Sequence, residues 1–508
     1  MPFELVDAVL GETRAVGARL RDLPSRVGVY FLLAMCLFPE VGYRLVWDKM
    51  VCALGGLTPV TPTAKALRDL RRRVGVAPMH ALFEVLAGPL AQPRTPGVRF
   101  GGYRLVSFDG CSSQKVPDTS KNRAWLGWSR AGYPMLELMT LVETGTRSII
   151  GAVFGRTAEG ETSYARRLLG LLTPQMLVLW DRGFDANDFL AEVCATGAQV
   201  LGRIKNNRRL PITARLCDGS YRSRIGAVDV RIIDAHITVT CADGTTFTGY
   251  YRLVTTLADH RRYPAARLIT LYHQRWEHES AYYALRHTLL GGRVLRSGDP
   301  AGVAQEMWSL LTLYQLLRTV MVDAAESRPG TDPDRVSFTI ALHTARDQLI
   351  SAAGVIGETI DLLGTIGTRL LDGLLDARRL RVSTRKVKSS TSRYHTRQND
   401  GRPTTSTNVT ALDIAVYEPP TATPAPPQHK PHPLPRYRPP SGLPARILNL
   451  IRTQPHRHWH TREIAAHLAI PNNNSLRARL WKMVHLRGQL HQTRPATYTL
   501  NTQIPCPP

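Results

Sequence analysis

The chain has 508 residues, too many for one ordinary hydrophobic core, so three or four structural units are expected. Its formal net charge of +25 at pH 7 favours nucleic acid as the partner, although a GC-rich codon bias toward Arg contributes to the excess of basic residues. No Cys-x-x-Cys pair occurs, and the best apolar run, 27–38, is too short to span a bilayer. Neither a zinc ribbon, nor a disulfide scaffold, nor a membrane anchor is therefore indicated, and a soluble intracellular protein is expected.

Residues 1–95 carry helical periodicity in short stretches. The segments 3–20, 64–73 and 80–86 show apolar residues at helical spacing, and 27–38 is apolar enough to be a buried helix. This pattern predicts a compact helical N-terminal domain, which we expect to bind DNA.

The pattern then changes to strands. Four segments are predicted to be strands, 103–110, 133–143, 147–155 and 176–180. Helices are predicted over 162–172 and 185–196, with a further strand over 198–204. This order resembles that of an RNase H-like α/β domain, which predicts a multidomain α/β protein with its catalytic core in 96–205 and 264–330.

Short alternating strands separated by turns occupy 206–263 and predict a β-rich insertion in that core. A long helix is expected over 264–290, and another over 303–325. Further helices over 335–378 predict a C-terminal helical part, 331–380.

The last part of the chain divides into a linker and a small domain. Residues 381–440 are rich in Ser, Thr, Arg and Pro, which predicts a basic, extended linker. Three helical segments and a hairpin-like tail predict a winged-helix-like domain over 441–500. Its third helix exposes Arg477, Arg479 and Lys482 to a DNA major groove, although such domains also serve as protein–protein modules.

Two acids, Asp109 and Asp181, each follow an apolar strand. Strand ends are where α/β sheets commonly present their sites, and a buried acid is costly unless it is paired or bound to metal. Taken singly, each is better explained as a turn residue or a helix N-cap.

The predicted helix over 264–290 carries a third acid on a distinctive face. At about 100° per residue, Tyr272, Arg275, Glu279 and Arg286 fall within an arc of about 60°. The alternative is a solvated face with an ion pair between Arg275 and Glu279.

The spacing Tyr-x2-Arg-x3-Glu-x6-Arg resembles the Y-R-E-K signature of DDE transposases of the insertion element 4 family, with Arg286 in the place of Lys. The sequences FDG at Asp109 and WDRGF at Asp181 resemble the first and second acidic motifs of that family. The resemblance runs over residues 1 to about 380.

The resemblance implies a transposase with Asp109, Asp181 and Glu279 as its catalytic acids. Carboxylates suit two Mg²⁺ ions, with Mn²⁺ as a substitute, and Asp109 is expected to bridge both ions. The expected reaction is cut-and-paste transposition, in which a nick, a hairpin and its reopening precede strand transfer. Tyr272, Arg275 and Arg286 are expected to hold DNA phosphates, and Trp276 is a candidate for stacking on a displaced base, unless it is core.

The partners implied are double-stranded DNA with terminal inverted repeats, target DNA, and a second copy of the chain in the DNA complex, in the cytoplasm at the nucleoid. Three alternatives remain open at this point. They are a DNA-binding regulator without chemistry, a structure-selective nuclease of the same fold, and a decayed transposase that binds but does not cut.

Overall fold

The structure, a computed structural model, describes most of the chain. The described residues are 1–17, 22–52, 59–127, 132–273, 281–351, 364–377, 381–382, 407–417, 443–470, 474–485, 489–494 and 496–500. The chain divides into two compact units, Met1–Ala422 and Thr423–Pro508. The finer domain boundaries predicted within the first unit stay predictions.

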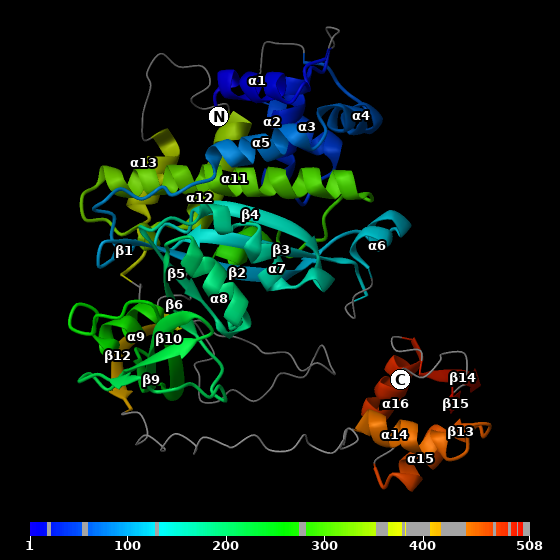
Figure 1. Ribbon diagram of the computed structural model, residues 1–508. Coiled ribbons are helices and arrows are strands. Elements are labelled where there is room, and N and C mark those ends of the chain that lie inside the picture. The colour runs from blue at the N-terminus through cyan, green and yellow to red at the C-terminus, as the bar shows by residue number, and fades with distance from the viewer. Residues whose placement is uncertain are drawn as a thin grey trace. The chain divides into compact units, whose positions relative to one another are not determined.

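The first unit begins with helices, as its apolar periodicity predicts. They are α1 (Phe3–Glu12), α2 (Ser25–Leu37), α3 (Tyr43–Val51), α4 (Ala64–Val74) and α5 (Ala77–Leu86). The first ends earlier than the predicted segment 3–20, and α3 was not predicted. Of these, α2 and α5 pack against α11 (Pro300–Ser327), which lies between the N-terminal helices and the central sheet (Figure 1). The ring of Trp308 on α11 joins the layers, with centroids 5.2 Å from Phe83 of α5 and 4.8 Å from Phe154 of the sheet.

The central sheet contains the five predicted strands. They are β2 (Tyr103–Lys115), β3 (Met135–Glu143), β4 (Ile149–Arg156), β5 (Met176–Trp180) and β6 (Gln199–Arg203). Their order is β4-β3-β2-β5-β6, in which β3 is antiparallel to both neighbours and β5 is parallel to β2 and β6. The short β1 (Arg99–Phe100) pairs with β2. This mixed sheet with helices fits the predicted RNase H-like core.

Short helices connect these strands. They are α6 (Ser120–Leu126), α7 (Glu161–Arg166), α8 (Asn187–Ala195) and the 3₁₀ turns η1 (Thr157–Glu159), η2 (Leu169–Leu171) and η3 (Arg182–Phe184). The single helix predicted over 162–172 is therefore divided into α7 and η2. The core between β5 and α8 is aromatic, with the rings of Trp180 and Phe189 5.6 Å apart.

The β-rich segment extends the central sheet. It contains β7 (Ala214–Arg215), β8 (Tyr221–Ile225), β9 (Val228–Cys241) and β10 (Thr246–Thr255). Because β10 pairs antiparallel with β6 and β9 pairs with β10, these strands lengthen the sheet sideways. Among the described residues, twelve strands join in one sheet.

One part of the predicted linker 381–440 forms a strand instead. Residues Thr407–Val416 form β12, which pairs antiparallel with β9, and Arg381–Val382 form β11 beside it. The prediction of an extended linker was wrong for this segment. The physical reason is the alternation of Leu412, Ile414 and Val416, which pack on the apolar cluster around β9 and outweigh the polar composition of their surroundings.

Helices complete the first unit. The long helix predicted over 264–290 is described at its two ends only, as α9 (Ala265–His273) and as the π-helix η5 (Ala284–Leu289). After α11 follow η6 (Pro333–Arg335), α12 (Phe338–Ser351) and α13 (Gly364–Asp372). No helix among the described residues is long and apolar enough to cross a membrane.

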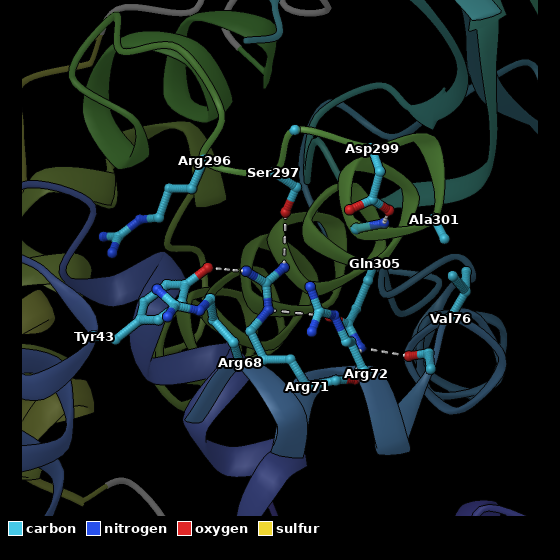
Figure 2. Close-up of a pocket in the computed structure, with 13 residues that line it drawn as sticks. Tyr43, Arg68, Arg71, Arg72, Val76, Arg296, Ser297, Asp299, Ala301 and Gln305 are labelled. Atoms are coloured by element: carbon cyan, nitrogen blue, oxygen red, sulfur yellow. Dashed lines mark hydrogen bonds between the residues drawn. The ribbon is translucent and has the colours of Figure 1, made fainter. Parts of the chain in front are cut away.

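A buried arginine fastens α4 to the start of α11. Arg71 is 6% exposed and forms an ion pair with Glu306, with 3.2 Å between guanidinium nitrogen and carboxylate oxygen. The same guanidinium donates to Gln305, Ser297 and Tyr43, as Figure 2 shows from the side of a cavity of about 310 Å³. Each nitrogen of the Arg71 guanidinium thus has a hydrogen-bond partner within the chain, as a buried charge requires.

The second unit contains three helices and a small sheet. They are α14 (Leu443–Arg452), α15 (Thr461–His467) and α16 (Asn474–His485), with β13 (Trp459–His460), β14 (Leu490–Arg494) and β15 (Thr497–Leu500). The strand order is β13-β15-β14. Ile447, Trp459 and Leu480 lie in its own apolar core, so this unit does not depend on the first for burial.

Candidate active site

The first two predicted acids lie on neighbouring parallel strands. Asp109 is half-buried within β2, which continues beyond the predicted end of the strand to Lys115, and its Oδ1 accepts a hydrogen bond of 3.1 Å from the Gly110 amide. Asp181 directly follows β5, and its Oδ1 accepts from the Gly183 amide at 2.7 Å.

The register of the two strands sets these acids side by side. Ser107 of β2 pairs with Leu179 of β5 in parallel, and two further residues along each strand lead to Asp109 and Asp181. Because side chains two residues apart leave a strand on the same face, the two acids continue the same face as that pair. The sheet therefore brings together two of the three predicted catalytic acids.

Glu279, the third predicted acid, lies outside the described residues, as do Arg275 and Trp276. On either side of this stretch, Tyr272 and Tyr282 form hydrogen bonds to the backbone next to the first two acids. The Tyr272 hydroxyl donates to the carbonyl of Trp180 at 3.0 Å, one residue before Asp181. The Tyr282 hydroxyl donates to the carbonyl of Asp109 itself and lies 3.0 Å from the Thr140 hydroxyl.

Tyr272 therefore lies inside the protein. It is 5% exposed, and a buried phenol needs a hydrogen-bond partner, which the Trp180 carbonyl supplies. A DNA phosphate would have to compete with that bond, so the structure gives Tyr272 a positioning contact. Its predicted DNA contact stays a prediction.

Tyr282 is a neutral donor at this position. Burial first, and then the nearby Asp109 and Cys111, raise the pKa of the Tyr282 phenol well above its ordinary value. The hydroxyl therefore stays protonated and can hold the backbone of Asp109 in place. Sequence reasoning did not single out Tyr282, because a tyrosine among apolar residues is usual for a core.

Arg286 lies beside the strand that carries Asp109. Its guanidinium is half-buried, with a nitrogen 3.9 Å from the sulfur of Cys111, two residues after Asp109. Residues Ala284–Leu289 form a π-helix, so the rotation of 100° per residue used to place Arg286 on one face with Tyr272 does not hold as far as this residue.

Two further acids close to this site were missed by sequence reasoning. Glu161 is the first residue of α7, and burial, followed by the charge of Asp181, raises its pKa above the usual value. Glu137 lies on β3, is 3% exposed, and has its pKa raised to about 7 by burial and then by Glu161. A Glu at a helix start after a strand was the only available signal, and it is too common to be specific.

The donor chemistry at this edge fits a hard divalent cation. Asp109 and Asp181 offer carboxylate oxygens, which Mg²⁺ and Mn²⁺ prefer. Within the described part of the chain, no group of three or more His, Cys, Asp and Glu side chains is arranged to hold a metal ion. The predicted set of three requires Glu279, which lies outside that part.

Arg477 and Arg479, the two predicted DNA contacts described on α16, are exposed. Leu476, Leu480 and Met483 of the same helix are buried, so the arginines lie off the packed face. The side chain of Lys482 is outside the described residues.

Two family models match the chain in order. The model of the insertion element 4 transposase N-terminal domain matches residues 1–84, and the model of the transposase DDE domain matches residues 101–316. Together they span more than half of the chain. The second match contains both described acids and Glu279.

Curated relatives agree with these matches. The chain is similar to transposase InsG for insertion sequence element IS4 of Escherichia coli K12, at 26% identity over 77% of this chain and 91% of that protein. It is also similar to the putative transposase InsZ of Escherichia coli K12, at 27% identity over 37% of this chain and 64% of that protein.

A piggyBac transposase, solved in a synaptic complex with hairpin DNA, covers 72% of this chain and 81% of its own at 10% identity. Its TM-score of 0.35 is too low to carry an argument. The Y-R-E-K subgroup stays a prediction. The two family models matched in order and the curated relatives lead to one conclusion: the chain belongs to the insertion element 4 family of DDE transposases.

Proposed function

We propose that this transposase catalyses cut-and-paste transposition of an insertion sequence, with Asp109, Asp181 and Glu279 as its catalytic acids. The observation that carries the proposal is the placement of Asp109 and Asp181 at one edge of adjacent parallel strands. Tyr272 and Tyr282 support the inclusion of Glu279, because they fasten the chain on both sides of it next to those two acids.

The three carboxylates would hold two Mg²⁺ ions, or Mn²⁺ as a substitute. Such ions supply an activated water or 3′-hydroxyl and stabilise the charge on the phosphorus and on the leaving oxygen. The residues of the chain supply rigidity. The Gly183 amide fixes the rotamer of Asp181, and the Tyr282 hydroxyl fixes the backbone of Asp109.

The proposed reaction sequence uses this one site repeatedly. Hydrolysis frees a 3′-hydroxyl at the end of the element, and that hydroxyl attacks the opposite strand to form a hairpin. Water reopens the hairpin, and the 3′-hydroxyl then attacks target DNA. In the two hydrolytic steps water breaks one phosphodiester bond and leaves a 5′-phosphate and a 3′-hydroxyl, and in the other two a 3′-hydroxyl forms one phosphodiester bond as another breaks, so only the nucleophile changes.

Arg286 is a proposed DNA contact, and so are Arg275 and Trp276, which lie outside the described residues. Arg286 has the best structural support, because its guanidinium is half-buried next to Cys111 on the strand of Asp109. A planar guanidinium at that position would bind a phosphate oxygen close to the cleaved bond.

The second unit is proposed to be a winged-helix domain that binds DNA. Three helices with a β14–β15 hairpin and a third strand are the parts that this fold requires. Arg477 and Arg479 on α16, together with Lys482, are proposed to contact the major groove. DNA binding by the N-terminal helices and assembly of two copies on paired element ends are proposed as well.

The test is cleavage of DNA that carries the terminal inverted repeats flanking the gene. Wild-type protein with Mg²⁺ should nick such DNA and produce hairpin ends, and Asp181→Ala should bind the DNA without cutting it. Asp188→Ala is the matched control, because Asp188 is an exposed acid on the following helix.

Other results would select a rival function. If Asp181→Ala cuts as well as wild type, the proposed site is wrong. Binding without cutting by the wild type would identify a regulator or a decayed transposase. Cutting that requires neither paired ends nor repeats, and that joins no strands, would identify a structure-selective nuclease.

A further inference from the structure

Glu161 has a half-buried carboxylate without a partner of opposite charge in the described part of the chain. It forms no hydrogen bond and no ion pair with the described residues, although its neighbours Glu159 and Arg166 each have an ion-pair partner. A carboxylate that is partly removed from water usually gains such a partner, because its desolvation is otherwise uncompensated.

The position of this carboxylate is set by two glycines of the acidic motifs. A Cβ atom added to Gly110, next to Asp109, would lie 2.9 Å from Oε1 of Glu161. A Cβ added to Gly183 would lie 2.9 Å from Oδ1 of Asp181 and 3.1 Å from Oε2 of Glu161. A side chain at Gly110 would therefore displace the Glu161 carboxylate, and one at Gly183 would crowd both Asp181 and Glu161, so the two glycines leave the space into which Glu161 extends.

Two other acids border Glu161. Asp181 shares the space at Gly183, and the buried Glu137 lies on the neighbouring β3 with an Oε1 that has no hydrogen-bond partner among the described residues. Glu161 and Asp181 therefore share one space without a guanidinium or ammonium that the described residues place between them, and the charge of Glu161 helps to raise the pKa of the nearby Glu137. Two carboxylates in one space are unfavourable in the protein alone, and a bound cation would relieve their repulsion.

We infer that Glu161 is a fourth acidic residue of the active site and that its carboxylate binds a divalent cation together with Asp181. The inference rests on the proposed metal-dependent function and deepens it. It also gives Gly110 and Gly183 a role, since each admits the Glu161 carboxylate beside one of the catalytic acids.

The test measures metal binding without DNA and without turnover. Mn²⁺ is titrated into the full-length protein by calorimetry, and thermal unfolding is followed with and without Mn²⁺. Glu161→Gln should weaken Mn²⁺ binding by about 10- to 100-fold and abolish most of the metal-induced rise in Tm. Glu159→Gln, two residues earlier and paired with Arg167, is the matched control and should bind Mn²⁺ like wild type.

Thermal unfolding without metal separates this role from a merely structural one. If Glu161 serves only to begin α7, its replacement by Gln lowers the Tm of the metal-free protein and leaves Mn²⁺ affinity unchanged, which would overturn the inference. If it is a cation ligand held among like charges, Glu161→Gln raises the metal-free Tm.

Two further variants complete the test. Asp181→Asn should lose Mn²⁺ affinity in any case, and if it does not, the proposed metal site itself fails. Gly110→Ala should weaken Mn²⁺ binding in the wild-type background but add little to Glu161→Gln, because both changes act on the same carboxylate. Fully additive losses would contradict the assigned role of Gly110.

Discussion

Two regions of the first unit bury charged side chains, and they differ in how those charges are compensated. At the junction of α4 and α11, Arg71 is paired with Glu306 and donates to three neutral acceptors. At the edge of β2 and β5, the described acids have amide donors and one another. The comparison shows that the charge of Arg71 is compensated within the chain, whereas at the second cluster Glu161 and Asp181 lie close together as like charges, as the proposed cation site would require.

The largest effect on stability should come from removing one partner of the buried ion pair between Arg71 and Glu306. Replacing Glu306 by Gln leaves the Arg71 guanidinium buried without its counter-charge, which should lower the free energy of unfolding by about 3–5 kcal/mol. Denaturant unfolding measures this. Glu192→Gln removes a carboxylate from an ion pair with Arg166 on the surface and should leave stability nearly unchanged. An equal loss of stability in both variants would show that the buried Arg71–Glu306 pair matters no more than a surface ion pair.

At the acidic edge, we expect the free energy of unfolding to depend on pH, because Glu137 is buried. Its folded pKa of about 7 lies above the unfolded value near 4.5, so the folded state holds the proton more tightly. The stability of the metal-free protein is therefore fully present below about pH 4.5 and falls as pH rises to about 7, by on the order of 2–3 kcal/mol.

Glu137→Gln has no proton to lose and should remove this slope. Unfolding curves of wild type and Glu137→Gln between pH 5 and 8 check the prediction. Parallel pH dependences of the two proteins would mean that Glu137 carries no such charge cost.

The smallest effect should come from the neutral donors that hold the acids in place. Tyr282→Phe removes the hydrogen bond to the Asp109 carbonyl and should cost about 1 kcal/mol of stability. Cleavage should fall by about tenfold, because the catalytic acid loses part of its positioning.

Tyr283→Phe is the control for Tyr282→Phe. Its hydroxyl belongs to the adjacent residue, which is 64% exposed, and its loss should change neither stability nor cleavage. Equal cleavage rates for Tyr282→Phe and wild type would leave Tyr282 without a positioning role.

The central strands could be predicted from the sequence because each is an apolar run bounded by turn residues. Asp109 and Asp181 each follow an apolar run, but that position alone is typical of a turn residue or a cap, and it was the resemblance of the surrounding FDG and WDRGF motifs to the family that singled them out. The strand Thr407–Val416 was missed because its alternation lies within a polar, Pro-rich stretch, and its partner β9 is distant in sequence.

The rest of the site depends on contacts that no local pattern records. Glu161 meets Asp181 only because α7 packs against β2, β3 and the turn η3 that follows β5, and the fit becomes visible only at Gly110 and Gly183. Arg286 was placed with the rotation of an α-helix, but a π-helix carries it, and nothing in its residue types predicts that change. The sequence around Tyr282 is typical of a core residue. Its ring is buried as expected, but its hydroxyl donates to the Asp109 carbonyl, which no local pattern indicates.

The most direct test of the acidic edge as a cation site is a change of metal preference at Asp109. A thiolate binds Mg²⁺ poorly and softer ions better, so Asp109→Cys should fail to cleave inverted-repeat DNA with Mg²⁺ and regain cleavage with Mn²⁺. Cleavage by Asp109→Cys at the wild-type rate with Mg²⁺ alone would contradict the account, because Asp109 could not then be a metal ligand.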